Sequence, residues 1–183
     1  MSAPERRAAI IAATIPLLRE RGVSITTRHI AEAAQVAEGT IFSVFRDKET
    51  LIEAAVEAAL APAGTIDQIA RIDPALPLES RLDQAVAALQ AHFADIWRLL
   101  AAVGPAGPPR RMPERNQAFL HFGPTLEALL EPVASRLRVS TANAARTLLA
   151  CALGCSHPAV VEEPGRSDEI VALFLDGVRK KAR

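Results

Sequence analysis

The sequence predicts an all-α protein, with an N-terminal head of three short helices followed by a C-terminal helical bundle that forms the body. Apolar residues recur at intervals of three and four along most of the 183 residues, which is the period of an amphipathic helix. Runs that alternate apolar and polar residues, as strands do, are scarce. Half of the residues are hydrophobic and 23% are charged, a composition that favours a packed core over disorder.

The first helix is expected over residues 4–21, because Gly22 is typical of the position just after a helix end. Pro16 should kink this helix, since proline removes one backbone hydrogen bond. The apolar side chains that share one face are Ile10, Ala13 and Leu17.

Three shorter helices are expected next, at residues 27–34, 38–45 and 48–60. Thr26 or Thr27 can cap the first of them and Asp47 the last, because their side-chain oxygens accept from unpaired helix amides. A brief turn at Gln35 and Val36 separates the first two. The helix at 48–60 connects the head to the body.

The body begins after a proline-containing junction over residues 62–77. A long bundle helix is expected over residues 78–103, where a four-three alternation links Leu82, Val86, Leu89, Phe93, Ile96 and Leu100. Residues 104–113 hold four prolines and two glycines and are expected to form a loop. Two further helices are expected at 114–121 and 124–137.

The last two helices, expected at residues 141–156 and 167–181, carry more apolar surface than one partner can cover. The last helix has one stripe through Ile170, Leu173, Phe174 and Gly177, and a second through Val171, Leu175 and Val178. One stripe can pack on the chain's own core and the other on the same helices of a second copy. We therefore expect a homodimer formed through the last two helices.

The segment TTRHIAEAAQVAEGTIFSVFRDKETL, residues 26–51, carries the functional signal. It resembles the DNA-binding head of the tetracycline-repressor (TetR) family of transcription regulators. The matching residues are Thr26, Thr27, Ile30, Ala31, Ala34, Val36, Gly39, Thr40, Ile41, Phe42, Phe45, Lys48, Glu49 and Leu51. The resemblance implies a helix-turn-helix DNA-binding domain at residues 1–47 and a ligand-binding and dimerisation domain at residues 48–183.

The predicted partner is double-stranded operator DNA, because a helix at residues 38–45 is narrow enough to enter the major groove. Thr40 and Ser43 are expected to reach base edges, and Gly39 to let the backbone approach closely. Arg28 could reach a guanine or a phosphate, and Thr27 and Lys48 lie at helix N-termini, where phosphate is favoured; such contacts position the protein on DNA. The full set of expected DNA contacts is Thr27, Arg28, Glu38, Gly39, Thr40, Phe42, Ser43 and Lys48.

Several positions depart from the family pattern. Gln35 occupies the turn position that is often glycine, and Ala37 replaces a hydroxyl cap, so the turn should cost about 1 kcal/mol more than usual. Phe42 replaces the usual tyrosine, so a phosphate hydrogen bond is missing. Glu38 should repel phosphates unless it accepts from a cytosine amino group.

The resemblance also implies an effector pocket in the body, whose occupancy changes the separation of the two heads. The expected lining is His92, Phe93, Trp97, Met112, Phe119 and Phe122, which suits a small, largely apolar ligand, although plain core packing explains the same aromatic residues. Cys151 and Cys155 could form a redox switch, or a metal site with His157, but buried inert thiols are the expected state. No cofactor or metal is expected.

Charge and composition bound the remaining possibilities. The chain carries 21 basic and 21 acidic side chains, so overall charge does not favour nucleic acid, and a head that has lost DNA binding remains an alternative. No enzyme motif stands out, which leaves a helical enzyme as the more distant alternative. The N-terminus lacks a signal-peptide cleavage pattern and no stretch approaches a membrane span, so a cytoplasmic protein is expected.

Overall fold

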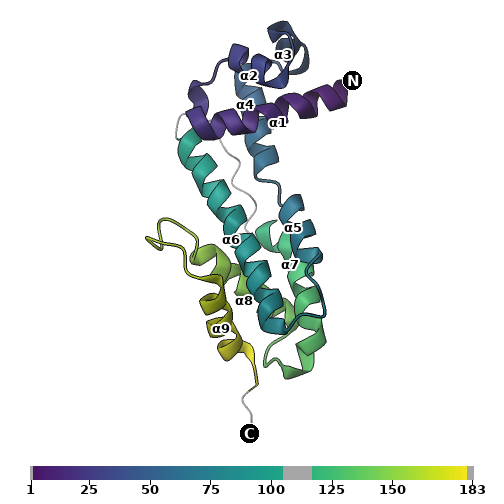
Figure 1. Cartoon of the computed structure of the whole chain (residues 1–183), viewed down its shortest axis with the longest axis vertical. Helices are drawn as coiled ribbons and strands as arrows, with labels where there is room; N and C mark the ends of the chain where they lie inside the picture. Colours follow the sequence, from purple (N-terminus) through teal and green to yellow (C-terminus); the bar gives the residue numbers. More distant parts are fainter. Residues whose placement is uncertain (1, 105–116, 181–183) are drawn as a thin grey trace. The chain divides into compact units, whose positions relative to one another are not determined.

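The computed structural model describes residues 2–104 and 117–180 (Figure 1). Within these residues the regular secondary structure is helical. An isolated antiparallel β-bridge also joins Leu137 and Arg179. The prediction of an all-α fold with an N-terminal helix-turn-helix is confirmed. The described residues divide into two compact units: the first contains residues up to 61 and the part of the long helix from 96 onward, and the second contains residues 62–95 and 117–180.

The first unit begins with α1, Ala3–Arg21, which starts in a capping box and continues through Pro16. Ser2 donates its backbone N–H to Glu5 Oε2 at 2.7 Å and accepts from the Glu5 amide through its hydroxyl. These reciprocal bonds satisfy two amides that the helix leaves unpaired. The other elements of this unit are η1 (Gly22–Ser24), α2 (Thr27–Ala34), α3 (Glu38–Val44) and α4 (Lys48–Ala59).

The core of the first unit includes side chains from every one of its α-helices. Its buried members are Ile10, Leu18, Ile25, Ile30, Ala31, Ile41, Phe45, Leu51, Ile52, Ala55, Val56, Leu99 and Val103. Four of them lie on α4, so this helix belongs to the same core as α2 and α3. The division between residues 47 and 48 remains a proposal about which residues meet DNA; it does not follow the boundary of the compact unit.

The second unit contains α5 (Ala63–Ala70), the N-terminal part of α6 (Leu78–Val103), α7 (Gln117–Leu130), η2 (Glu131–Arg136), α8 (Thr141–Gly154) and α9 (Ser167–Val178). The sequence analysis named no helix in the junction at 62–77, but α5 lies there. Its short pattern holds Ile66 and Ile69, and Ile69 is completely buried. Pro62 is the N-cap of this helix and Arg71 its C-cap.

Two other expectations for the body also need correction. A single helix, α7, runs through Gly123 and Pro124 instead of breaking there, because Phe122 and Leu126 on either side are buried in the same core. The last helix ends at Val178, and the backbone then pairs with residues 136–138: Arg138 N–H donates to the Val178 carbonyl and Lys180 N–H to the Arg136 carbonyl, each at 2.9 Å. The predicted loop at 105–113 lies outside the described residues.

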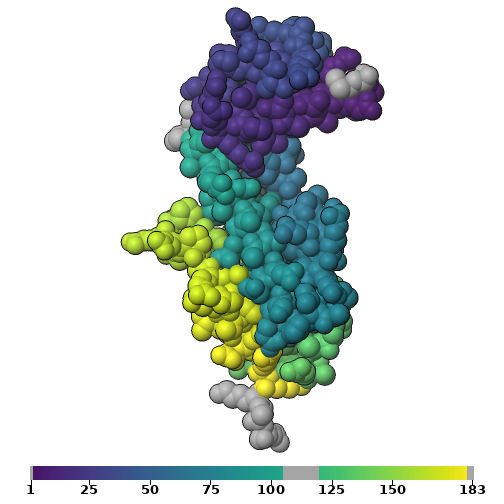
Figure 2. Space-filling model, in the orientation of Figure 1, coloured from purple at the N-terminus to yellow at the C-terminus, as the bar shows by residue number. Residues whose placement is uncertain are grey.

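The second apolar stripe of α9 is buried within the second unit, and so are two of the four residues of the first stripe. Ile170 and Phe174 of one, and Val171, Leu175 and Val178 of the other, are buried. The exposed surface of this part of α9 holds Ala172, Leu173, Asp176 and Gly177, and Leu173 is 75% exposed. The surface of α9, in yellow, is open on the visible face of this unit (Figure 2).

Helix α6 is long and apolar enough, with a mean hydropathy of 1.2 over 18 residues, to cross a membrane by length and composition. The expectation that no stretch reaches this threshold is therefore wrong. The many alanines of α6 explain why the helix passes this threshold without a long run of bulky apolar residues, since alanine raises the mean hydropathy but adds little side-chain surface. Leu82 and Leu89 are completely buried in this fold and Leu99 nearly so, which is the usual arrangement of a core helix, so the feature is weak evidence for a membrane segment.

Candidate nucleic-acid interface

A tight turn between α2 and α3 fixes the direction of α3. Gln35 adopts a left-handed conformation, with φ 55° and ψ 43°. Its N–H donates to the Glu32 carbonyl at 3.2 Å, and the Val36 N–H donates to the Ala31 carbonyl at 3.0 Å. These bonds satisfy carbonyls at the end of α2, as glycine usually allows at this position. Glutamine therefore adopts the required geometry at a cost in strain.

The start of α3 is held by a side chain from α2. Ala37 supplies no side-chain cap, so the first amides of α3 lack the bond that a hydroxyl residue would accept. The Thr27 hydroxyl donates to Glu38 Oε1 at 2.5 Å. This bond joins the N-termini of α2 and α3 and occupies one of the two carboxylate oxygens that the sequence suggested for base contact.

Helix α3 has a buried face and an open face. Ile41 is completely buried and Phe45, just after the helix, is 3% exposed. The open face consists of Glu38, Gly39, Phe42 and Ser43, which are exposed. A Cβ added to Gly39 would meet no atom within 4 Å, so the helix start is accessible to a large partner.

Two of the predicted base-reading residues have internal bonds. The Ser43 hydroxyl donates to the Thr40 carbonyl at 2.7 Å, which leaves its oxygen lone pairs for a partner. Thr40 itself is half-buried. The structure therefore places both on α3 but directs the Ser43 proton inward.

The predicted cationic contacts differ in their surroundings. Arg28 is exposed and pairs with Glu32 one turn along α2, Nε to Oε1 at 3.0 Å. Lys48 is half-buried, and its ammonium donates to the carbonyls of Val23 and Ile25 at 3.0 and 2.9 Å. Lys48 therefore ties the start of α4 to the segment after α1, a positioning role that spacing alone did not indicate.

One exposed cation beside α3 was not among the expected contacts. Arg46 follows the C-cap residue Phe45, and its side chain is 86% exposed while Nε donates to Asp47 Oδ2 at 2.7 Å. The sequence could have indicated this residue, because Arg46 comes directly after the helix expected at residues 38–45. Arg7 lies over the Phe45 ring, 4.8 Å from guanidinium carbon to centroid.

The expected effector residues do not form one open site. His92, Phe93 and Phe122 lie together in the second unit, with ring centroids 5.5 to 6.2 Å apart. Phe93 and Phe122 are only 4% and 2% exposed, as core residues are. Trp97 is half-buried in the first unit. Met112 and the side chain of Phe119 lie outside the described residues.

His92 is the accessible member of this aromatic cluster. Burial lowers the pKa of its imidazole, and the charge of Asp95 partly opposes that effect. The neutral ring is therefore favoured near neutral pH. A neutral imidazole can both donate and accept a hydrogen bond, which suits contact with a ligand.

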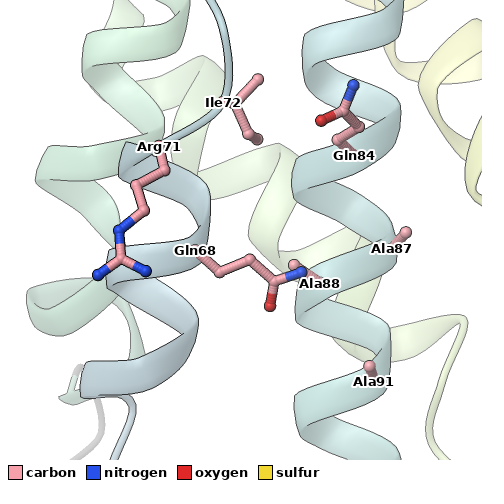
Figure 3. A pocket seen from close by; sticks show the side chains of 7 residues that line it. All are labelled: Gln68, Arg71, Ile72, Gln84, Ala87, Ala88 and Ala91. Carbon is pink, nitrogen blue, oxygen red and sulfur yellow. The ribbon is translucent and has the colours of Figure 1, made fainter.

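A groove between α5 and α6 was not predicted (Figure 3). It has a volume of about 320 Å³ and is lined by Gln68, Arg71, Ile72, Gln84, Ala87, Ala88 and Ala91. Gln68 extends from α5 towards Ala88 of α6, and Gln84 faces the gap from the other side. The three small alanines leave space for the groove, and the two amides and Arg71 add polar groups to a lining that is otherwise apolar. The only sequence signal for this groove was the series of alanines on α6. Small residues of this kind are equally typical of ordinary close packing between helices.

Cys151 on α8 and Cys155, the C-cap residue of that helix, are free, half-buried thiols four residues apart. Burial raises the pKa of the Cys151 thiol, and Cys155 adds to that effect. A raised pKa keeps the thiol protonated and weakly reactive. Among the residues that the structure describes, no group of three or more histidine, cysteine or acidic side chains could hold a metal.

Comparison with known proteins finds relatives of the N-terminal head in sequence and relatives of the whole chain in fold. Residues 10–55, which reach from α1 into α4, match bacterial regulatory proteins of the tetR family. Similar solved structures include the TetR transcriptional regulator SCO0520 from Streptomyces coelicolor, with 24% identity over 96% of this chain and 99% of that chain and a TM-score of 0.53.

Two further structures are similar over almost the full length. NalD of Pseudomonas aeruginosa, the secondary repressor of the MexAB-OprM multidrug efflux pump, shares 24% identity over 99% of this chain and 100% of its own, with a TM-score of 0.57. A transcriptional regulator from Cytophaga hutchinsonii shares 18% identity over 93% and 97%, with a TM-score of 0.67. At these identities the likeness concerns the fold. Comparison with curated proteins finds no match.

Proposed function

We propose that this chain, which belongs to the tetR family of bacterial regulatory proteins, is a ligand-responsive repressor that binds a near-palindromic operator as a homodimer. The observation that carries the proposal is the open face of α3, presented by the left-handed turn at Gln35 and free of any covering side chain at Gly39. Such a helix can enter the major groove, where base pairs differ in their donors and acceptors.

Each DNA contact has a proposed role. Thr27, Arg28 and Lys48 orient the head against phosphates, and Lys48 does so through the backbone segment that it holds. Gly39 allows close approach, while Glu38, Thr40, Phe42 and Ser43 lie at the groove. Because the chain is neutral overall, we expect few phosphate contacts and a shallow dependence of affinity on salt.

The proposed dimer uses the outward surfaces of α8 and α9. Leu173 is 75% exposed on α9, and Ala150 of α8 and Gly177 of α9 are small and exposed. A prominent leucine among small residues favours close helix packing across a two-fold axis. The dimer would place two α3 helices in successive major grooves, and the bound protein would occlude a promoter.

We further propose that a small effector binds the body and releases DNA. His92 is the accessible candidate among the expected residues, and the groove at Gln68, Arg71 and Gln84 is a second place for a ligand. Release requires the effector to favour the conformation with mis-spaced heads by about 1 to 3 kcal/mol. A regulator of this kind acts in the cytoplasm, where its DNA is.

The test is selection of operator sequences from random duplex DNA, followed by affinity measurements on the full chain. Arg28→Ala and Thr40→Ala should each weaken operator binding at least fivefold while the dimer stays folded, since each loses a contact worth about 1 kcal/mol or more. Arg138→Ala, at an exposed arginine of the second unit, is the matched control and should bind as the wild type does.

The neutral charge keeps a second function open, a helical ligand-binding or adaptor protein without DNA binding. Failure to enrich any sequence, together with retained binding of a small molecule, would favour that alternative. Turnover of a candidate compound would instead indicate a helical enzyme.

A further inference from the structure

The open face of α3 carries an exposed aromatic ring. Phe42 is 55% exposed, whereas the other phenylalanines whose burial the structure describes, Phe45, Phe93, Phe122 and Phe174, are at most 4% exposed. A single exposed apolar residue is common on a protein surface, so what sets this ring apart is its position on α3. The ring lies one helical turn after Glu38, on the face that we propose enters the groove.

The polar side chains beside Phe42 are partly occupied inside the protein. Glu38 Oε1 accepts from the Thr27 hydroxyl at 2.5 Å, and the Ser43 hydroxyl donates to the Thr40 carbonyl at 2.7 Å. Both bonds reduce the capacity of this face to read bases by hydrogen bonds. Gly39 offers no side chain at all. The largest uncommitted group on the face is therefore apolar.

One chemical feature of the major groove suits an apolar reader. Thymine presents a C5 methyl group there, which the other three bases lack. Contact between a phenyl ring and this methyl removes apolar surface of both from water. A phenyl ring has no hydroxyl to donate to a phosphate, so this side chain gains more from a methyl than from the DNA backbone.

We infer that Phe42 is a specificity-determining residue that reads the C5 methyl of a thymine in each operator half-site. This inference rests on the proposed DNA-binding function and adds a defined base and a defined contact to it. It assigns the preference at that position to an apolar contact. Hydrogen bonds from Glu38, Thr40 or Ser43 would then set the neighbouring positions.

The test uses the full chain and an operator selected from random duplex DNA. Each thymine is replaced in turn by deoxyuridine, which removes only the methyl. At one thymine per half-site the replacement should weaken wild-type binding about fourfold, the loss that corresponds to one buried methyl or methylene. Replacement at other thymines should change affinity less than twofold.

A variant series assigns the effect to the ring. Phe42→Ala should bind the thymine and deoxyuridine operators equally, while Phe42→Tyr keeps the ring and should keep the methyl sensitivity. Because Phe42 is exposed, melting of the helical signal should be unchanged in both variants. The deoxyuridine series is measured with the wild-type protein, so its outcome does not depend on whether a variant folds.

The possible results separate the two proposals. If a selected operator binds but no thymine shows the methyl effect, or if Phe42→Ala retains it, the assignment of Phe42 is overturned and DNA binding stands. If no sequence is enriched, the DNA-binding function fails and the assignment fails with it.

Discussion

Gln35 holds the turn between α2 and α3 in a conformation that glycine adopts more easily. Its φ of 55° brings Cβ close to the following carbonyl. We predict that Gln35→Gly raises the free energy of unfolding by about 1 kcal/mol, measured by urea denaturation. The control is Ala37→Gly, at an extended position with φ −69° where glycine relieves no strain. A Gln35→Gly protein no more stable than wild type would contradict this account.

Asp47 caps α4 through two bonds to Thr50, to its amide at 2.8 Å and its hydroxyl at 2.5 Å. These bonds and the Arg46 guanidinium lower the pKa of this carboxyl to about 2. Because the folded pKa lies below the ordinary value of 3.8, the charged cap stabilises the fold above pH 4 and loses that effect as pH falls towards 2.

We therefore predict that Asp47→Asn melts at a lower temperature than wild type at pH 7, and that the difference shrinks between about pH 4 and pH 2. Melting of the helical circular dichroism signal at each pH measures this. Asp73→Asn, whose carboxylate accepts from an amide in a surface turn, controls for general acid sensitivity. A difference that stays constant with pH would show that ionisation of Asp47 does not matter.

At this scale, sequence reasoning succeeded where the chemistry is local. The Asp47 cap and the unusual turn residue Gln35 were both identified from neighbouring residues alone. The partners of Lys48 and Glu38 were not, since they lie 25, 23 and 11 residues away. Only folding brings such groups together, so a cation that suggests phosphate binding can instead bind backbone carbonyls.

At the scale of elements, the end of α1 depends on a close approach between Gly22 and α6. Gly22 has φ 58°, and a Cβ there would lie 2.3 Å from the Ala102 carbonyl oxygen. We predict that Gly22→Ala lowers the free energy of unfolding by about 3 kcal/mol, because backbone must move. Gly39→Ala, where a Cβ meets nothing, should leave stability unchanged or raise it. Equal stability of the two variants would contradict the prediction.

Helices marked by a long apolar pattern, by a cap or by the family motif were predictable, and helices without such a mark were not. The range 78–103 was predicted to the residue, because the four-three alternation from Leu82 to Leu100 extends through most of this 26-residue helix. Helix α5 was missed because, unlike the equally short α2, it has no side-chain cap: Pro62 occupies its N-cap position. In α7, Pro124 suggested a break, but burial of the residues on either side keeps the helix continuous.

At the scale of the whole molecule, the proposed dimer depends on one prominent side chain. We predict that Leu173→Glu yields a monomer by sedimentation and weakens operator binding more than tenfold, because a carboxylate on each copy would be buried against its twin. Leu120→Glu changes another exposed leucine, 65% accessible on α7, and should remain dimeric. A Leu173→Glu protein with the wild-type mass in solution would refute the proposed interface.

The head could be assigned from sequence more fully than the body. The helix-turn-helix is specified by residues close together in the chain, so its open face was predicted nearly complete. The proposed effector site could not be assigned in this way, because Phe93 and Phe122 proved to be core residues and the groove between α5 and α6 joins side chains from two helices. Aromatic residues alone do not distinguish a cavity from a packed interior.

Trp97 gives the protein a built-in optical reporter. It is the chain's one indole, and there is no tyrosine, so ultraviolet emission from the native protein comes almost entirely from a single turn of α6. Its half-buried environment makes the emission wavelength sensitive to small changes in hydration. Titrations with compounds or duplexes can therefore be followed on the unmodified chain, without dyes or tags.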